Sequence, residues 1–598
     1  MITKINKKQW IKGLRKQIFH YSLFTFTFSA SLMLASCLDT IILPDDKTVD
    51  EDFWQTKSDV SSMVNAAYSA MASDNVLTRL IVWGDFRSDE LVLATSPSGS
   101  TYDALAEMAA VNMQTTNMFG AWASVYSVIN RCNIVLERAE EVQQVDPNYT
   151  EGDYLTDRSQ MLALRALCYF FLVRNYRDVP YITEAYMNSS QDMQVPQSTP
   201  AYVLGRCIED LEEAAKNSVK ASGFSTSEWQ RVGWLTDDGI NALLADIYLW
   251  RASLTHSDAD YQRCVDYCDL VIESKKKQHV PGRNEVEQKE YPLAEAIAEY
   301  TELFVNQNAE ESVFELQSRS NLAVVQYYYK YGNNSSGEGF LKASQIFGSA
   351  SSKVANLQAS QVFSSNDLRY YASCYDVTSD GSLDVRKMIS SSSLTSKTSQ
   401  RRETSINYEG INKNYLVYRL TDIMLMKAEA LVQQVDTTME AAQQKELLRV
   451  PFTLVQAVNT RSLSQDNLTD SMTWSDYQNY DKEQMELLVM QERLRELCFE
   501  GKRWYDLMRY SYRHVDYDAS KYDRLLVDLS ESNSLGAISQ DMKKLMIRSR
   551  GADGSGVAAK MQNEAYLYMP VPNSDIIVCP LLRQNPAYKN TNDFEKSY

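Results

Sequence analysis

The stretch that decides the fold runs from Asp237 to Lys275 and reads DDGINALLADIYLWRASLTHSDADYQRCVDYCDLVIESK. Apolar residues recur in it at spacings of three and four, the period of one face of an α-helix. Ala242, Ala245, Tyr248 and Leu249 offer small and large side chains that can interlock with a neighbouring helix. The pattern predicts one helix over 237–254 and a second over 261–275, a pair roughly as long as a tetratricopeptide unit of about 34 residues.

The same periodicity recurs along most of the chain. It predicts single helices over 58–71, 121–138, 158–175 and 202–216, and a second pair over 415–434 and 439–462. Asp178, Val179 and Pro180 end the third of these, because proline lacks an amide donor and clashes with the preceding turn. Helical pairs must stack on neighbours to bury their faces. We therefore predict an all-α fold with tetratricopeptide-like pairs; the alternative is helical packing without a true repeat.

A less regular region, 276–413, separates the two pairs. It holds a Ser-rich run over 390–405 and a Gly/Asn/Ser run over 332–339, which are typical of surface loops. The segment from Glu310 to Gln317 fits either a short strand or the end of a helix. We expect a loop-rich face here.

The amino terminus has the features of an export signal. Six Lys or Arg residues precede an apolar stretch over 21–35, and Leu34-Ala35-Ser36-Cys37 follows. An uncleaved membrane anchor is the alternative, but a spanning helix needs about 20 apolar residues and this stretch is shorter. The Leu-Ala-Ser-Cys sequence resembles the lipobox of bacterial lipoproteins. It predicts a signal peptide over 1–36, lipidation of Cys37, a tether over 37–52 and one domain over 53–598.

Net charge argues against nucleic acid as a partner. The whole chain carries 60 Lys and Arg against 78 Asp and Glu, a net charge of −18. Removal of the predicted signal, with its six basic residues, leaves 54 Lys and Arg against 78 Asp and Glu, a net charge of −24. Nucleic-acid binding depends on neutralising phosphates with Lys and Arg, so such a surface excludes it.

Cysteines and histidines show no metal-ligand pattern. Cys264 and Cys268 share one helical face, but no further Cys or His lies close to complete a metal set. An exported protein can pair cysteines, yet most here lie in apolar helical patterns. We expect buried thiols, no metal and no cofactor. The eight cysteines beyond Cys37 are Cys132, Cys168, Cys207, Cys264, Cys268, Cys374, Cys498 and Cys579.

A series of short motifs, in one order along the chain, resembles the SusD/RagB family. The motifs are Phe53-Trp54, Ala66-Ala67-Tyr68, Trp122 with Tyr126 and Ile129-Asn130, 163–166, 169–170, 176–181, 242–245 with 248–249, Glu311 with 314–316, 418–423, 427–430, 492–507, 568–572 and 584–586. The acidic export signal that such surface lipoproteins often carry after the Cys is missing, since Leu38-Asp39-Thr40 follows Cys37.

The resemblance implies an all-helical receptor with a loop-rich ligand-binding face. It implies a lipoprotein anchored in the outer membrane, facing the cell surface, that binds glycan nutrients. It also implies a partner, a SusC-like TonB-dependent transporter, to which the glycan is delivered without catalysis. A peptide-binding member of the same family is the first alternative, and a surface glycoside hydrolase is the second.

Loop-borne aromatic residues are the candidate ligand contacts, because an aromatic ring offers a wide apolar plate with a polar tip. One group is Trp83, Asp85, Arg87 and Asp89, after a predicted helix and before a Ser/Gly-rich loop that reaches Tyr102. The second is Tyr327, Tyr328, Tyr329 and Tyr331, and the third is Phe340 with Phe347. A structural ion pair of Arg87 or Asp89, and a buried tyrosine cluster, are the alternatives.

Glu492, Glu496 and Glu500, here called the carboxylate row, invite an enzyme interpretation. Two carboxylates about 5 to 9.5 Å apart across an open cleft can hydrolyse a glycosidic bond. The same spacing also builds ion pairs on helices, and Arg493, Arg495 and Arg503 lie among these residues. We interpret the row as structural.

Overall fold

The computed structural model describes residues 53–588, with gaps at 95–97, 189, 280–289, 295–296, 319–338, 351–354, 357–361, 365, 377–382, 388–412, 464–470, 515–517 and 530–553. The predicted signal over 1–36, Cys37 and the tether over 37–52 lie outside the described residues. From Thr56 onward the chain forms one compact unit.

The predicted central pair is present as α10 (Asp237–Thr255) and α11 (Asp258–Gln278), which pack on each other. The connection is tight because His256 ends α10 in the left-handed region, with φ of 54°, and Ser257 caps α11. Ala242, Ala245 and Leu249 are fully buried. The helical pattern of this stretch thus correctly predicted both helices and their buried face.

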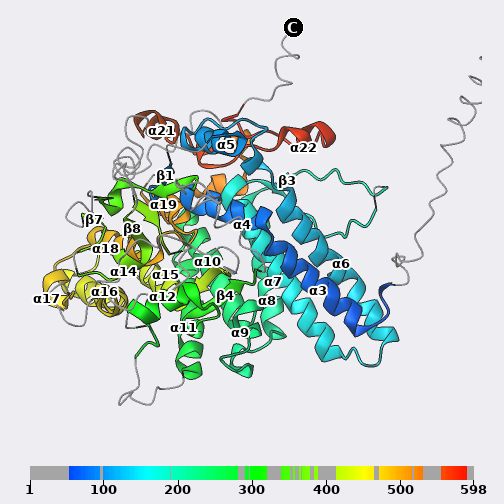
Figure 1. The fold of residues 1–598 in the computed structure, drawn as a ribbon, viewed down its shortest axis with the longest axis horizontal. Coiled ribbons are helices and arrows are strands. Elements are labelled where there is room, and N and C mark those ends of the chain that lie inside the picture. The colour runs from blue at the N-terminus through cyan, green and yellow to red at the C-terminus, as the bar shows by residue number, and fades with distance from the viewer. Residues whose placement is uncertain are drawn as a thin grey trace, which may run out of the picture. The chain divides into compact units, whose positions relative to one another are not determined.

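Four long helices stack before this pair (Figure 1). They are α3 (Lys57–Met71), α6 (Ala123–Val145), α7 (Glu151–Tyr176) and α8 (Pro200–Lys216), and successive members pack together in the order α3, α6, α7, α8. Helix α7 is buried from Ser159 to Tyr176 and ends at Arg177, whose φ is 67°. All four predicted helices are confirmed, but α6 ends seven residues later and α7 begins seven residues earlier than periodicity predicted.

The second half adds a further stack. Helix α15 (Leu420–Gln433) packs on α11, α16 (Ala441–Ser462) and α18 (Lys482–Leu497), and α19 (Arg503–Arg513) packs on α10. The shorter helices are α4 (Asp74–Ile81), α5 (Ser100–Ala109), α9 (Gln230–Gly233), α12 (Ile297–Val305), α14 (Arg369–Ser373), α17 (Trp474–Tyr477), α21 (Gly554–Lys560) and α22 (Asn573–Val578). Single turns are η2 (Val82–Phe86, π-helical), η3 (Met118–Gly120), η4 (Ala221–Gly223), η5 (Gln345–Phe347), η8 (Ala519–Asp523), η9 (Leu526–Asp528) and η11 (Glu564–Leu567).

Short antiparallel strands complete the fold. Strands β1 (Leu91–Leu93), β5 (Leu341–Ala343), β9 (Leu383–Val385) and β8 (Cys374–Asp376) form one sheet in that order. The two-stranded pairs are β10 (Tyr415–Arg419) with β4 (Ser312–Leu316), β2 (Val179–Pro180) with β3 (Gln197–Ser198), and β6 (Ser349–Ala350) with β7 (Ala355–Asn356). The fold is mostly helical, as predicted.

One predicted helix was wrong at its start. The range 415–434 is a strand over Tyr415–Arg419 followed by helix α15 from Leu420. Aromatic and β-branched residues at the start favour a pleated surface, and β4 supplies the partner that the local pattern does not reveal. The same pairing shows that the ambiguous segment Glu310–Gln317 contains a strand.

The cysteines pack as small hydrophobic side chains. Cys579 is half-buried, and the other seven cysteines of the described part of the chain are buried. Burial raises the pKa of the Cys132 thiol to about 12, which keeps it protonated and unreactive. The expectation of buried thiols is confirmed for these seven.

Candidate functional site

Two of the predicted ligand contacts, Trp83 and Asp85, lie in the interior. Both belong to η2, which continues α4 as a π-helical turn where we expected a loop. Trp83 is fully buried and its indole N–H donates to the Phe119 carbonyl at 2.9 Å. Asp85 accepts a hydrogen bond from the Gly501 amide at 2.7 Å. Both side chains therefore serve packing between distant segments and are not presented to solvent.

Arg87 and Asp89 are also buried and paired within the protein. Asp89 binds Arg503 through two hydrogen bonds of 2.8 and 3.0 Å. Arg87 donates to the Leu567 carbonyl at 2.6 Å, and its guanidinium lies 4.3 Å from the ring centre of Trp504. Burial lowers the pKa of Arg87 to about 10. These contacts favour a structural role for Arg87 and Asp89 over contact with a ligand.

The neighbouring Glu90 gives a pH-dependent prediction. Burial, reinforced by the Asp85 carboxylate, raises the pKa of Glu90 well above its ordinary value of 4.5. The folded protein therefore holds this proton more tightly than the unfolded chain, so Glu90 costs stability as the pH rises above about 4.5. We expect Glu90→Gln, whose side-chain carbonyl can still accept from the Phe499 amide, to raise the free energy of unfolding at pH 7.5 by about 1 kcal/mol or more.

Urea denaturation of both proteins at pH 7.5 and pH 4 measures this effect. The two midpoints should converge at pH 4, where Glu90 is protonated in both states. A variant less stable than wild type at pH 7.5 would show that Glu90 is ionised and stabilising.

The remaining predicted contacts are placed differently. Tyr102 is half-buried on α5. Tyr327, Tyr328, Tyr329 and Tyr331 lie outside the described residues, so the structure does not test them. Phe340 is half-buried, whereas Phe347 is fully buried and lies 5.0 Å from the ring of Phe499. Phe347 therefore belongs to the core.

The carboxylate row is buried in a network of ion pairs. Glu492 pairs with Arg369 at 2.7 Å, and Glu500 pairs with Arg419 at 2.8 Å. Burial tends to raise the pKa of Glu492, but Arg369 and Arg495 outweigh it and hold the pKa below its ordinary value. A general acid needs the opposite shift and contact with a cleft. The row holds the fold together, as the structural interpretation predicted.

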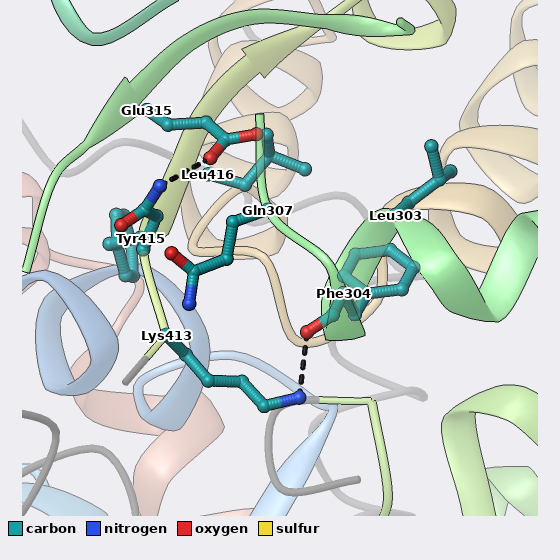
Figure 2. Close-up of a pocket in the computed structure, with 8 residues that line it drawn as sticks. Leu303, Phe304, Gln307, Glu315, Lys413, Tyr415 and Leu416 are labelled. Carbon is teal, nitrogen blue, oxygen red and sulfur yellow. Dashed lines mark hydrogen bonds between the residues drawn. The ribbon is translucent and has the colours of Figure 1, made fainter. Parts of the chain in front are cut away.

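A small pocket of about 20 Å³, room for about one water molecule, lies where β4 ends and β10 begins. Figure 2 shows Gln307 projecting between Glu315 on one side and Lys413 on the other. Lys413 donates to the Phe304 carbonyl at 2.7 Å. The lining residues are Leu303, Phe304, Gln307, Glu315, Lys413, Asn414, Tyr415 and Leu416. Gln307 and Asn414 are half-buried and the other six are buried, so the pocket combines apolar walls with a few polar groups near its mouth.

Four polar side chains, here called the polar cluster, are joined by hydrogen bonds: Glu315 and Asn414, which line the pocket, and Asn308 and Gln317 beside them. Asn414 donates to Glu315 at 2.8 Å and to Gln317 at 3.0 Å. Gln317 donates to Asn308 at 2.8 Å. The alternation of a strand puts Glu315 of β4 and Gln317, the residue that follows the strand, on the same side, while Phe314 on the other face lies against Gly239 at the start of α10.

Some hydrogen-bonding capacity in the pocket is unused. Within the described part of the chain, Oε1 of the buried Glu315 accepts no hydrogen bond. Gln307 and Asn308 adopt the left-handed region, with φ of 60° and 51°. Consecutive non-glycine residues in this region store backbone strain, which is found at functional sites.

No local pattern in the sequence marked the polar cluster as a ligand contact, although Glu315 lies in one of the family motifs. Alternation along 312–317 was an available signal for placing Glu315 and Gln317 on the same side. Asn414 lies 106 residues from Asn308, so only the folded chain brings these two together.

The described residues contain no group of three or more His, Cys, Asp or Glu side chains placed to hold a metal ion. None of their helices combines the length and the apolar character that a membrane crossing requires.

Comparison with known proteins agrees with this fold. A model of the SusD family matches residues 286–588, and a model described as "Starch-binding associating with outer membrane" matches residues 43–224. The SusD-like protein P38 of Formosa agariphila is 27% identical over 508 residues, covering 81% of this chain and 90% of that protein. The SusD-like protein P2 of the same organism is 23% identical over 516 residues, covering 81% of this chain and 90% of its own length.

Solved structures show the same architecture. A SusD homolog from Bacteroides thetaiotaomicron aligns with a TM-score of 0.65 at 17% identity, covering 90% of this chain and 99% of that one. A SusD superfamily protein from Bacteroides vulgatus aligns with a TM-score of 0.62 at 16% identity, covering 90% of this chain and all of that one. With two family models matching successive parts of the chain and relatives matching most of its length, this chain belongs to the SusD family.

Proposed function

We propose that this protein is a lipid-anchored lipoprotein at the surface of the outer membrane that binds oligosaccharides and delivers them to a SusC-like TonB-dependent transporter. Members of the family are generally binding proteins without catalysis, and outer-membrane association is part of the matched family description. We propose Cys37 as the lipidated residue. Several acyl chains on one residue hold a protein firmly, because each buried methylene contributes about 0.8 kcal/mol.

The observation that supports glycan binding is the polar cluster, whose Asn308, Gln317 and Asn414 side chains are only half-buried. Sugars present hydroxyl groups that both donate and accept hydrogen bonds, and side-chain amides suit both roles. The described carboxylate row is buried and paired, which favours binding over hydrolysis.

A whole-cell experiment tests the anchor, the orientation and the binding together. Intact cells of a bacterium with an outer membrane, producing wild-type protein, are incubated with a panel of fluorescent neutral oligosaccharides and peptides. We expect retention of oligosaccharides by wild-type cells and no retention by cells producing Cys37→Ala, whose protein leaves the membrane fraction. Purified Cys37→Ala protein should still bind the same sugars, since the lipid has no part in the pocket.

Three outcomes would contradict parts of the proposal. Membrane retention of Cys37→Ala would rule out the lipid anchor at that residue. Binding only after the outer membrane is permeabilised would place the protein on the inner leaflet. Retention of peptides in place of sugars would favour the peptide-binding alternative.

A further inference from the structure

Helix α22 presents apolar side chains to solvent. Its sequence includes Ile576, Ile577 and Val578 in succession, yet none of its six residues is buried. Ile577 is 61% exposed and Val578 is 72% exposed. A surface helix normally turns its apolar residues toward the core. The described fold instead leaves these aliphatic side chains in contact with water.

The loop that leads into η3 and the strand β3 adjoin α22. The Asn573 amide donates to the Thr115 carbonyl at 3.2 Å, and the Arg583 amide, just after α22, donates to Oε1 of Gln197 at 2.9 Å. Figure 1 shows α22 (red) at the margin of the folded unit. The exposed large apolar side chains on these adjoining segments, here called the apolar patch, are Met118, Met193, Ile577, Val578 and Leu581, all about half exposed or more.

Helix α22 is held in place although it buries none of its residues. The indole N–H of Trp122, the residue before α6, donates to the Asp575 carboxylate at 2.6 Å. Trp122 is itself buried, with its ring 5.0 Å from that of Tyr176. The Pro572 carbonyl accepts from the amides of Asp575 and Ile576 at 3.0 and 3.2 Å. A helix of six residues is not stable alone in water, so these contacts keep α22 and its exposed side chains in one conformation.

The area and the charge of the surface disfavour a second copy of this chain as the cover of the apolar patch. Burial of one aliphatic side chain removes about 100 Å² from water, so the five side chains offer about 500 Å². A stable interface buries about 800 Å² on each partner. Two copies, each with a net charge of −18, also repel each other. A lipid bilayer needs no complementary surface, because binding there scales with the apolar area that enters it.

We infer that the apolar patch inserts into the surface of a lipid bilayer, as a membrane contact additional to the lipid at Cys37. The patch is aliphatic and uncharged, which suits the boundary between headgroups and acyl chains. Outer-membrane association is part of the description of the family model that matches residues 43–224, so a bilayer is an apolar phase that the protein meets. The net negative charge favours zwitterionic over anionic lipid. The inference rests on the proposed function in one respect, since the proposed anchor keeps the patch near the bilayer.

The distance from the start of the fold to the apolar patch is within reach of the tether. The Lys57 amide donates to the Asp146 carboxylate at 2.8 Å, so the chain enters the fold beside the end of α6. The other end of α6 contacts α22 through Trp122. The 23 residues of α6 rise about 35 Å, and the tether over 37–52 can span up to about 55 Å. An anchored protein can therefore place the apolar patch on the bilayer that holds its lipid.

Flotation with phospholipid vesicles tests the inference. The chain from Leu38 onward is used, because it lacks the predicted signal and the lipid but keeps the whole compact unit from Thr56 on. We expect it to float with phosphatidylcholine vesicles, equally at about 0.1 and about 1 M salt, because salt screens charges and not apolar contacts. Added anionic phosphatidylglycerol should weaken binding at low salt. Ile577→Thr combined with Val578→Thr should lower the partition coefficient about tenfold, since hydroxyl groups replace buried methyl groups.

The matched control is Leu447→Thr combined with Val450→Thr. These two aliphatic side chains are about half exposed on α16 and lie outside the apolar patch, so the control should float as the unsubstituted chain does. Both double variants change exposed side chains only, and their circular dichroism and melting curves should match those of the unsubstituted chain.

Each other outcome overturns the inference. An unsubstituted chain that does not float, or a partition coefficient that the Ile577/Val578 variant leaves unchanged, removes the lipid contact. Equal loss in the control would assign binding to general surface apolarity, and binding that needs anionic lipid and disappears at about 1 M salt would assign it to charges. A dimer in sedimentation that the Ile577/Val578 variant dissociates would assign the patch to a second copy. Binding to native outer-membrane vesicles but not to pure lipid would assign it to a membrane protein.

The proposed function is tested separately. Its anchor is judged from cells that produce Cys37→Ala and its sugar binding from the oligosaccharide panel, whereas the vesicle assay uses protein without lipid and without sugar. Failure of either proposal therefore leaves the result for the other unchanged.

Discussion

Replacing Glu496 by alanine is expected to lower the free energy of unfolding by about 3–5 kcal/mol, the usual cost of leaving buried charges unpaired. Glu496 is fully buried on α18 and forms ion pairs with Arg369 at 2.9 Å, with Arg419 at 2.5 Å and with Arg461. Burial by itself tends to raise the pKa of this carboxyl, but Arg461, Arg419 and Arg369 outweigh burial and hold it well below its ordinary value. The carboxylate is therefore charged in the folded protein.

The effect is large because Glu496 joins segments that are distant in sequence. Arg369 opens α14, Arg419 ends β10 and Arg461 lies near the end of α16. Removal of the carboxylate leaves three guanidinium groups close together with fewer anions between them. Urea denaturation followed by circular dichroism measures the loss.

The matched control is Glu483→Ala in the same helix. Glu483 is exposed in the first turn of α18, and an exposed substitution of this kind changes stability by about 0.5 kcal/mol or less. If the two variants denatured at the same urea concentration, the ion-pair network would not be a main source of stability.

Gly84→Ala is expected to destabilise the protein by about 3 kcal/mol, at the upper end of the cost of overpacking. A Cβ atom there would lie 2.3 Å from the carbonyl oxygen of Gly501 and 2.7 Å from its carbon atoms. These are backbone atoms that cannot rotate away. Gly501 itself has φ of 73° and lies against Tyr415, whose hydroxyl would be 2.1 Å from a Cβ atom at 501.

Gly205→Ala gives the opposite expectation for the same chemical change. Gly205 lies inside α8, and nothing is within 4 Å of the position its Cβ atom would take. Alanine in a helix interior is favoured over glycine by about 0.5–1 kcal/mol. Differential scanning calorimetry should show a lower Tm for Gly84→Ala and a higher Tm for Gly205→Ala; a Gly84→Ala variant that melts with wild type would mean that η2 and the 501 turn can separate.

Local sequence patterns correctly predicted an element wherever the residues of that element alone determine its conformation. The apolar period over 237–254 and 261–275 predicted α10 and α11, because an amphipathic face shows in the residues that form it. The same reasoning failed at Tyr415–Arg419, where pairing with Ser312–Leu316 decides the conformation. It also failed to show that Trp83 and Asp85 are buried, since their partners Phe119 and Gly501 lie far along the chain.

The order of residues alone thus determined the helical class, the helical pairs and the motifs of the family, all of which depend on neighbours a few positions apart. The folded chain alone decided which polar groups meet. Asn308, Glu315, Gln317 and Asn414 converge because β4 and β10 pair across about a hundred residues. Contacts between distant segments depend on how the whole core packs, and no short stretch of sequence determines that packing.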